Sequence, residues 1–382
     1  MRLNKLFLAA LIACGAASSQ AGIVFDSSKD GVVFECGDAK SVQPVYDYLK
    51  KIGVDKDWLD VKVSGDGYNF RLKEDLSNAA TTDLASDARF DIQAGIVKIL
   101  DPSGSEKMVA TVSQKEVALA LMHPGRMTKY TGAQCGLEQF KDDIGIRQMT
   151  VAWTQSIGFG WPDGTPAQWN EKLWRKGTPL PGVDLHKAFT DAVVNPSDYS
   201  IGCYTAAKIV VSASILDYYK RVKKSPQQAA AVEAAMMQDG DPLVHVEPTK
   251  FWSFESDYDK SDQHSGKLMR MVTGVHYTSI VPGDWVYMLN TDPKTAQKTG
   301  YEGSNGIYLG MNKFSDYYND HEHAYIFEQK LDEVYQWRNG VFSRTRDANK
   351  VTPLTAEQIN DLKKSPAEGG FLISDRLVPR LF

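Results

Sequence analysis

The chain has 382 residues, of which 42% are hydrophobic and 24% are charged, and its formal net charge is −5. This is an ordinary globular composition, which excludes a disordered or fibrous chain, and the length predicts two domains or one large one. Lys and Arg total 43 against 48 Asp and Glu, with no basic block, so we expect no nucleic-acid partner. After residue 20 no apolar run approaches the roughly 18 residues that a membrane-spanning helix needs.

Residues 1–21 have the pattern of a secretory signal peptide. Two basic residues come first, Leu6–Ala17 is apolar or small, and small residues near Ala21 occupy both positions that a signal peptidase reads. Leu11–Cys14 also resembles a lipobox, in which case Cys14 would carry a lipid anchor. Both interpretations predict export, to the periplasm or the medium in the first case and to the outer membrane as a lipoprotein in the second.

Three cysteines follow the signal peptide, and an odd number in an oxidising compartment leaves one thiol unpaired. Cys36 and Cys135 each precede a glycine in polar, turn-like surroundings, whereas Cys203 opens an apolar helical pattern. The sequence therefore predicts a Cys36–Cys135 disulfide and a free Cys203. Three reduced cysteines remain the alternative.

Short strand-like runs separated by turn residues dominate residues 22–127, with one helix expected over Ala39–Lys51. These runs are residues 22–26, 31–36, 58–64, 68–73 and 89–100. Ser113 and Glu116 have the spacing of a capping box, which predicts a helix that ends before Pro124. We assign residues 22–127 to a small α+β domain.

The rest of the chain, residues 128–382, is assigned to a second domain. Its first part is rich in Trp, Gly and Pro, and these aromatic side chains indicate either core packing or the wall of a groove. An apolar helix begins at Cys203, and another runs from Pro226 to Gly240. The spacing of apolar residues then changes to a period of two, which predicts strands. The C-terminal tail is expected to be a loosely packed helix and strand. The expected strands cover Gly283–Asn290, Asn305–Asn312 and His323–Gln329, with a hairpin-like element over residues 334–346.

Cys203 follows Gly202 at the expected start of a buried helix, where unpaired backbone amides and the helix dipole favour a thiolate. A thiol nucleophile also needs an imidazole to move the proton and a polar group to orient that imidazole. His321 and His323 are the two candidate bases, and Asn305 is the expected orienting group.

The order of these motifs resembles the bacterial spore-coat protein-glutamine gamma-glutamyltransferases, which are papain-like transglutaminases. The resemblance covers roughly Tyr199 to Phe327 and places the family's nucleophile on Cys203 and its histidine on His323. It implies an α+β, papain-like fold, in which a helix that starts at cysteine packs on an antiparallel sheet. One position departs from the family, because Ser304 stands where a catalytic glutamate is expected.

The resemblance implies acyl transfer from a Gln side chain of a protein or peptide to an amine, through a thioester on Cys203. Trp161 and Trp285 are candidates for the wall of the acyl-donor groove, with core packing as the alternative. Because the glutamate is missing, three other functions stay open: amidase or deamidase, cell-wall peptidase, and inactive binding module. No cofactor and no metal site is expected, since Asp320–His323 offers two imidazoles without a confirmed third ligand.

Overall fold

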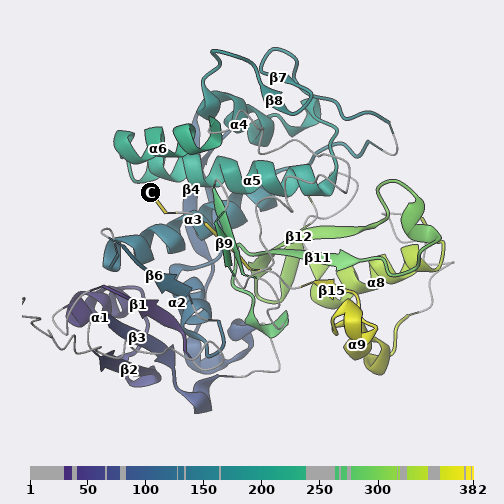
Figure 1. The fold of residues 1–382 in the computed structure, drawn as a ribbon. Coiled ribbons are helices and arrows are strands. Elements are labelled where there is room, and N and C mark those ends of the chain that lie inside the picture. The colour runs from purple at the N-terminus through teal and green to yellow at the C-terminus, as the bar shows by residue number, and fades with distance from the viewer. Residues whose placement is uncertain are drawn as a thin grey trace, which may run out of the picture.

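A computed structural model describes most of the chain from Asp30 onward (Figure 1). The described residues are 30–36, 41–64, 67–77, 83–126, 128–132, 135–162, 165–237, 263–265, 268–272, 277–315, 317–318, 325–342, 353–373, 376–379 and 381–382. The expected signal peptide and the expected strand over residues 22–26 lie outside them. Within them, no helix is both long and apolar enough to cross a membrane.

The N-terminal part is built around a four-stranded sheet in the order β2-β3-β1-β6. The central strand β1 pairs antiparallel with β3 and parallel with β6. The strands are β1 (Val32–Phe34), β2 (Leu59–Ser64), β3 (Gly67–Leu72) and β6 (Thr128–Tyr130), and the helix α1 spans Val42–Lys51. Strand β6 begins just after the predicted domain boundary at residue 127, so this sheet draws on both sides of that boundary.

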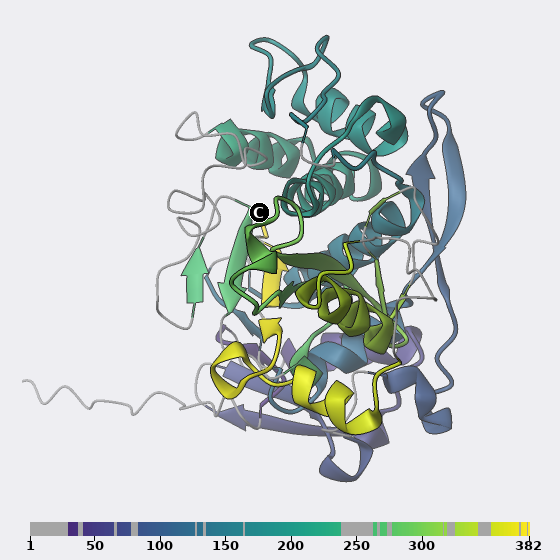
Figure 2. The same ribbon diagram turned by 90° about the vertical axis from the view of Figure 1, so that its right-hand side faces the viewer.

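Helices form the middle of the molecule, and α5 is their centre, because every residue of it from Tyr204 to Asp217 is buried. The helices α3 and α4 both pack against α5, and the hairpin formed by β4 and β5 packs on α3, which it flanks in blue in Figure 2. These elements are β4 (Gly95–Leu100), β5 (Glu106–Thr111), α2 (Gln114–Met122), α3 (Leu137–Ser156), α4 (Leu185–Val194), α5 (Cys203–Asp217) and α6 (Pro226–Met237).

A second, antiparallel sheet has the order β14-β13-β12-β11-β15. Helix α5 contacts β12 of this sheet, and α8 contacts β11, β12 and β13. The sheet elements are β11 (Trp285–Leu289), β12 (Gly303–Gly310), β13 (Lys313–Ser315), β14 (Tyr325–Ile326) and β15 (Leu372–Ile373), with α8 over Phe327–Arg338 and α9 over Ala356–Leu362. Smaller pieces are the hairpin β7 (Trp174–Arg175) and β8 (Thr178–Pro179) and the sheet of β9 (Gln263–Ser265), β10 (Met269–Val272) and β16 (Arg376–Pro379).

Side chains alternate across this second sheet and fill two separate cores. Trp285, Ile307 and Leu309 join the large core that includes α5, whereas Met288 and Tyr308 join a smaller core with α8. The predicted α+β class is therefore confirmed. Its predicted central feature, a helix that starts at cysteine and packs on an antiparallel sheet, is also present.

Three predictions of local structure differ from the structure. Helix α3 was not expected, since its sequence contains charged residues that prove to be buried and paired. The hairpin expected from residue 334 is wrong, because residues up to Arg338 belong to α8, and the strand expected over His323–Gln329 is only the two residues of β14 among those described. In α8 the buried Phe327, Leu331 and Val334 have helical spacing, so packing against the sheet outweighs the strand propensity of this segment.

Candidate active site

The thiol of Cys203 lies at the first residue of α5 and is free and partly exposed. Gly202 caps the helix and offers no side chain to the first backbone amides. These amides and the helix dipole therefore favour a negative charge at this end of α5. Because the rest of α5 is buried, the sulfur is held at a fixed place above the second sheet.

Asn305 of β12 donates a hydrogen bond from Nδ2 to the sulfur of Cys203, over 3.1 Å. The carbonyl oxygen of the same amide accepts a hydrogen bond from the indole Nε1 of Trp285, at 2.7 Å. An indole nitrogen can only donate, so Trp285 fixes which end of the Asn305 amide faces the sulfur. Asn305 was expected to orient an imidazole, but its amide group is directed at the thiol itself.

Tyr287 of β11 is a further member of the site that sequence reasoning missed. It stands directly opposite Asn305 in the β11–β12 pairing, and its hydroxyl donates to the carbonyl oxygen of Glu302 at 3.2 Å. Burial raises the pKa of Tyr287 well above its usual range, and the negative charges of Cys203 and Glu302 raise it further. Tyr287 therefore stays a neutral hydroxyl beside the thiol. Its place two residues after Trp285, and so on the same face of the strand, was the available signal.

Ser304, where the family resemblance expects a glutamate, does not face Cys203. It is paired with Met288 and lies on the opposite face of β12 from Asn305, toward the small core with α8. Its side chain is 2% exposed. A carboxylate at this position would be buried on the face of β12 away from the thiol. The serine at this position therefore removes no charge from the surroundings of the sulfur.

His321 and His323 lie outside the described residues, and the assignment of the base stays a prediction. The described residue nearest before them in the chain, Tyr318, donates from its hydroxyl to the carbonyl oxygen of Ile201 at 3.0 Å. Ile201 is two residues before Cys203. The chain that leads into the histidine segment is thus attached beside the nucleophile.

The two tryptophans expected to wall a groove have different surroundings. Trp285 is 2% exposed and packs on the ring of Tyr204, with ring centroids 5.3 Å apart, so it supports Asn305 and does not line a surface groove. Trp161 is partly buried and packs edge-on against Tyr318, at 5.1 Å. A substrate-binding role for Trp161 stays a prediction.

A buried charge cluster holds the start of β11. Arg147 of α3 bonds to Asp143 at 2.8 Å, to Asp284 at 2.7 Å and to the carbonyl oxygen of Pro282 at 3.0 Å. The other oxygen of Asp284 accepts from the backbone amide of Val281 at 2.7 Å. Since Asp284 directly precedes Trp285, this cluster fixes the strand that positions the Asn305 amide.

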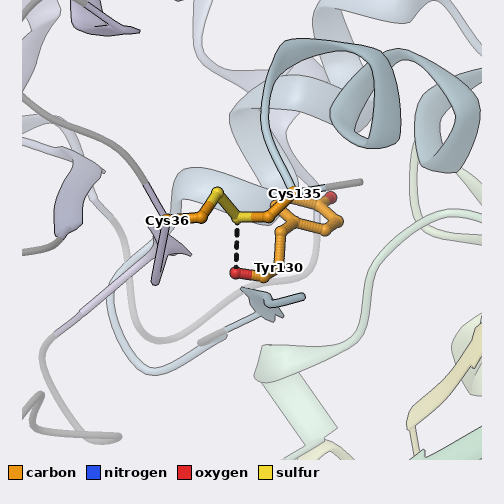
Figure 3. Close-up of a disulfide and its surroundings, with 3 residues drawn as sticks. All are labelled: Cys36, Tyr130 and Cys135. Carbon is orange, nitrogen blue, oxygen red and sulfur yellow. Dashed lines mark hydrogen bonds between the residues drawn. A yellow bond between two sulfur atoms is a disulfide. The ribbon is translucent and has the colours of Figure 1, made fainter. Parts of the chain in front are cut away.

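The disulfide joins Cys36 to Cys135, with their Cα atoms 5.8 Å apart (Figure 3). These are the two cysteines that the sequence pairs, and Cys203 is the free one. The sulfur of Cys135 also lies 2.9 Å from the carbonyl oxygen of Tyr130, which is a close contact and not a hydrogen bond, because a disulfide sulfur carries no proton. The bridge ties the segment after β1 to the segment before α3.

No group of three or more His, Cys, Asp or Glu side chains suited to a metal ion occurs among the residues that the structure describes. The Asp320–His323 segment lies outside them.

The sequence and the structure were compared with those of known proteins. Residues 137–325 match the family model described as protein-glutamine gamma-glutamyltransferase, a range that includes Cys203, Trp285, Asn305 and both candidate histidines. The chain is also similar to a transglutaminase from Geobacillus stearothermophilus, in a form without its C-terminal extension. That similarity has 18% identity and a TM-score of 0.37, and covers 64% of this chain and 93% of that one. No curated protein matches the sequence.

Proposed function

We propose that Cys203 is the nucleophile of this protein, a transglutaminase-like acyltransferase whose residues 137–325 match the protein-glutamine gamma-glutamyltransferase family that the sequence resemblance predicted. The observation that carries this proposal is the Asn305 amide, which is held by Trp285 with its donor end 3.1 Å from the free sulfur. A donor placed there stabilises a thiolate and is positioned close to where an attacked carbonyl oxygen develops charge.

In the proposed reaction the Cys203 thiolate attacks the side-chain amide carbon of a Gln residue in a protein or peptide. The carbon–nitrogen bond breaks, the nitrogen takes a proton from an imidazolium and leaves as ammonia, and a thioester remains on the sulfur. A primary amine then loses a proton to the imidazole and attacks the thioester, which forms the new amide and releases the thiolate. We assign the imidazole to His323, with His321 as the alternative.

Export is the second part of the proposal. A signal peptide over residues 1–21 sends the protein to the periplasm or the medium, and the Cys36–Cys135 disulfide supports an oxidising compartment. Lipidation of Cys14 and an outer-membrane location are the alternative. The mass of the N-terminal peptide of the mature protein separates a chain that begins after Ala21 from one that begins at a lipidated Cys14.

The test is incubation of the oxidised protein with a blocked Gln-Gly dipeptide and a labelled primary amine, with and without the Cys203→Ala change. We expect amine incorporation and equal ammonia release by the wild type, and neither by the Cys203→Ala variant. His323→Ala should lower the rate by about 100- to 10,000-fold, and His321→Ala should have a much smaller effect. Ammonia release without incorporation would make the protein an amidase, and no turnover of any Gln substrate would favour a binding module.

A further inference from the structure

A groove of about 1010 Å³ opens beside the start of α5. Gly202 and Thr205 of the α5 start form one side of it, and Trp169, Trp174 and Arg175 are among the residues of the other. Cys203 does not line the groove, but Gly202, its immediate neighbour in the chain, does. The groove therefore leads to the residue next to the reactive sulfur.

The glycine at residue 202 is not explained by the fold. Its φ is −71° and its ψ is 158°, which any residue adopts, so the backbone does not require a glycine there. A Cβ added to Gly202 would meet no atom of the described residues within 4 Å, so packing does not require a glycine either. Gly202 therefore keeps this end of the groove, next to Cys203 in the chain, free of a side chain.

The far wall of the groove is attached firmly to the segment that leads to the nucleophile. Gln168 and Ser200 exchange two backbone hydrogen bonds, at 2.9 and 3.1 Å. Asp191 of α4 accepts from Asn170 at 2.8 Å and from the hydroxyl of Tyr199 at 2.7 Å, which ties both segments to the same helix. A ligand in this groove is therefore held in a fixed relation to Cys203.

The lining of the groove selects for apolar groups. Trp169 is partly exposed and packs on the buried Trp174, with ring centroids 5.3 Å apart, so an indole surface remains available. Two cations and two anions also line the groove, and their formal charges cancel; they are Arg175, Lys176, Glu171 and Asp198. Neither an acidic nor a basic ligand is favoured by net charge, whereas an apolar or aromatic side chain gains from contact with Trp169.

We propose that this groove binds the polypeptide on one side of the reactive Gln of the acyl donor, with an apolar or aromatic side chain on Trp169. The proposal rests on the acyl transfer proposed above and adds to it a specificity for the residues that flank the Gln. The enzyme then selects extended Gln-containing segments with an apolar neighbour, and a short Gln substrate reaches Cys203 without using the groove.

The test compares kcat/KM for a blocked Gln-Gly dipeptide with that for a set of polar, Gln-containing peptides in which one Phe is moved along both sides of the Gln. We expect the wild type to prefer one Phe position by about tenfold or more. Trp169→Ala and Gly202→Val should each remove most of this preference through KM. Trp169→Ala should leave the dipeptide within about twofold of the wild type, because the dipeptide reaches Cys203 without using the groove.

The control is Trp58→Ala, which changes a tryptophan of the N-terminal part that lines a different pocket. It should leave the preference for Phe unchanged. Equal rates for all Phe positions in the wild type, or equal losses on dipeptide and peptides in both variants, would overturn the groove proposal. Failure of the wild type to turn over the dipeptide at all would instead contradict the proposed acyl transfer.

Discussion

The amide of Asn305 presents its donor group to the sulfur of Cys203 because the indole of Trp285 occupies its oxygen. A thiolate, and the oxyanion that follows it, are both stabilised by a donor that needs no rearrangement during the reaction. This arrangement differs from a carboxylate that strengthens an imidazole as a base. We propose that β12 therefore contributes to catalysis through this donor at the sulfur.

Asn305→Ala should lower kcat by about 100- to 1,000-fold, as loss of one oxyanion-type donor does in other enzymes. It should also lower the free energy of unfolding by about 1–3 kcal/mol, because the buried Trp285 nitrogen loses its acceptor. Steady-state amine incorporation and denaturant unfolding measure the two effects. Ser304→Ala, one residue away on the other face of the strand, is the matched control and should leave kcat within about twofold.

Asn305→Asp separates the two roles of this side chain. A carboxylate still accepts from Trp285, so the fold is kept, but it presents an acceptor instead of a donor to the sulfur. We therefore expect kcat to fall at least as far as in Asn305→Ala. An increase in kcat would show that the site needs a carboxylate on β12 and would contradict the donor role.

At the scale of elements, α3 holds β11 in place through buried charges. Arg147 is 1% exposed at its side chain, and Asp143 and Asp284 are not exposed at all. Burial alone would lower the pKa of Arg147, but the two carboxylates raise it above its usual range, so the guanidinium stays charged. Removing one member of such a cluster leaves an uncompensated charge in the core.

Arg147→Met should lower the free energy of unfolding by about 3–5 kcal/mol, which denaturant titration measures. The matched control is Lys141→Met on the same helix, which breaks the exposed pair with Glu138 and should cost less than about 1 kcal/mol. Equal losses in the two variants would contradict the structural role of the buried cluster. The cluster explains why α3 was missed from sequence: its charged residues look like a solvated surface until the partner Asp284, just before β11, is known.

The contact between α2 and the turn after β12 depends on a buried carboxyl group. Ser113 accepts from the backbone amide of Glu116, which is half of the predicted capping box. The carboxylate of Glu116, however, accepts from the amide of Met311 at 2.8 Å, 195 residues away in the chain. Burial raises the pKa of Glu116 to about 7, and the charge of Asp83 adds to this, while the Met311 amide opposes it.

Because the folded state binds this proton more tightly than the unfolded state, Glu116 stabilises the fold fully below its unfolded pKa of about 4.5. That contribution is lost as the pH rises through about 7. The free energy of unfolding of the wild type should therefore fall by up to about 3 kcal/mol between pH 4.5 and 8, relative to that of the Glu116→Gln variant. This variant is the matched control, because the amide oxygen of Gln still accepts from Met311. Parallel stability curves for the two proteins over this range would contradict the assignment.

Elements with a clear period could be predicted from the sequence, and those defined by distant partners could not. The strands at Trp285 and Asn305 and the helix at Cys203 follow directly from apolar periodicity. The face of the sheet to which each site side chain points, however, depends on the pairing register, that is, on which residue of β12 lies opposite Met288 and which lies opposite Tyr287. That register is set by two cores on opposite sides of the sheet, and it decides that Asn305 and not Ser304 meets the thiol.

For the whole molecule, the Cys36–Cys135 disulfide closes a long loop, since its ends are 99 residues apart in the chain. The Cys36→Ser, Cys135→Ser double variant should lose roughly 2–5 kcal/mol of unfolding free energy, mainly through the freedom gained by the unfolded chain. Cys203→Ser should have the reverse profile, with full stability and no amine incorporation. Unchanged stability of the double variant would mean that the bridge does not constrain the unfolded state.

The central claim is that Cys203 carries the acyl group between donor and acceptor, and the mass of the protein after reaction with a Gln substrate alone tests it most directly. In the absence of an amine, rapid acid quenching should trap an adduct equal to the substrate mass less one ammonia, located on the Cys203 peptide and released by added amine. Amine incorporation with no adduct on Cys203, or an adduct that persists in the Cys203→Ala variant, would contradict the account.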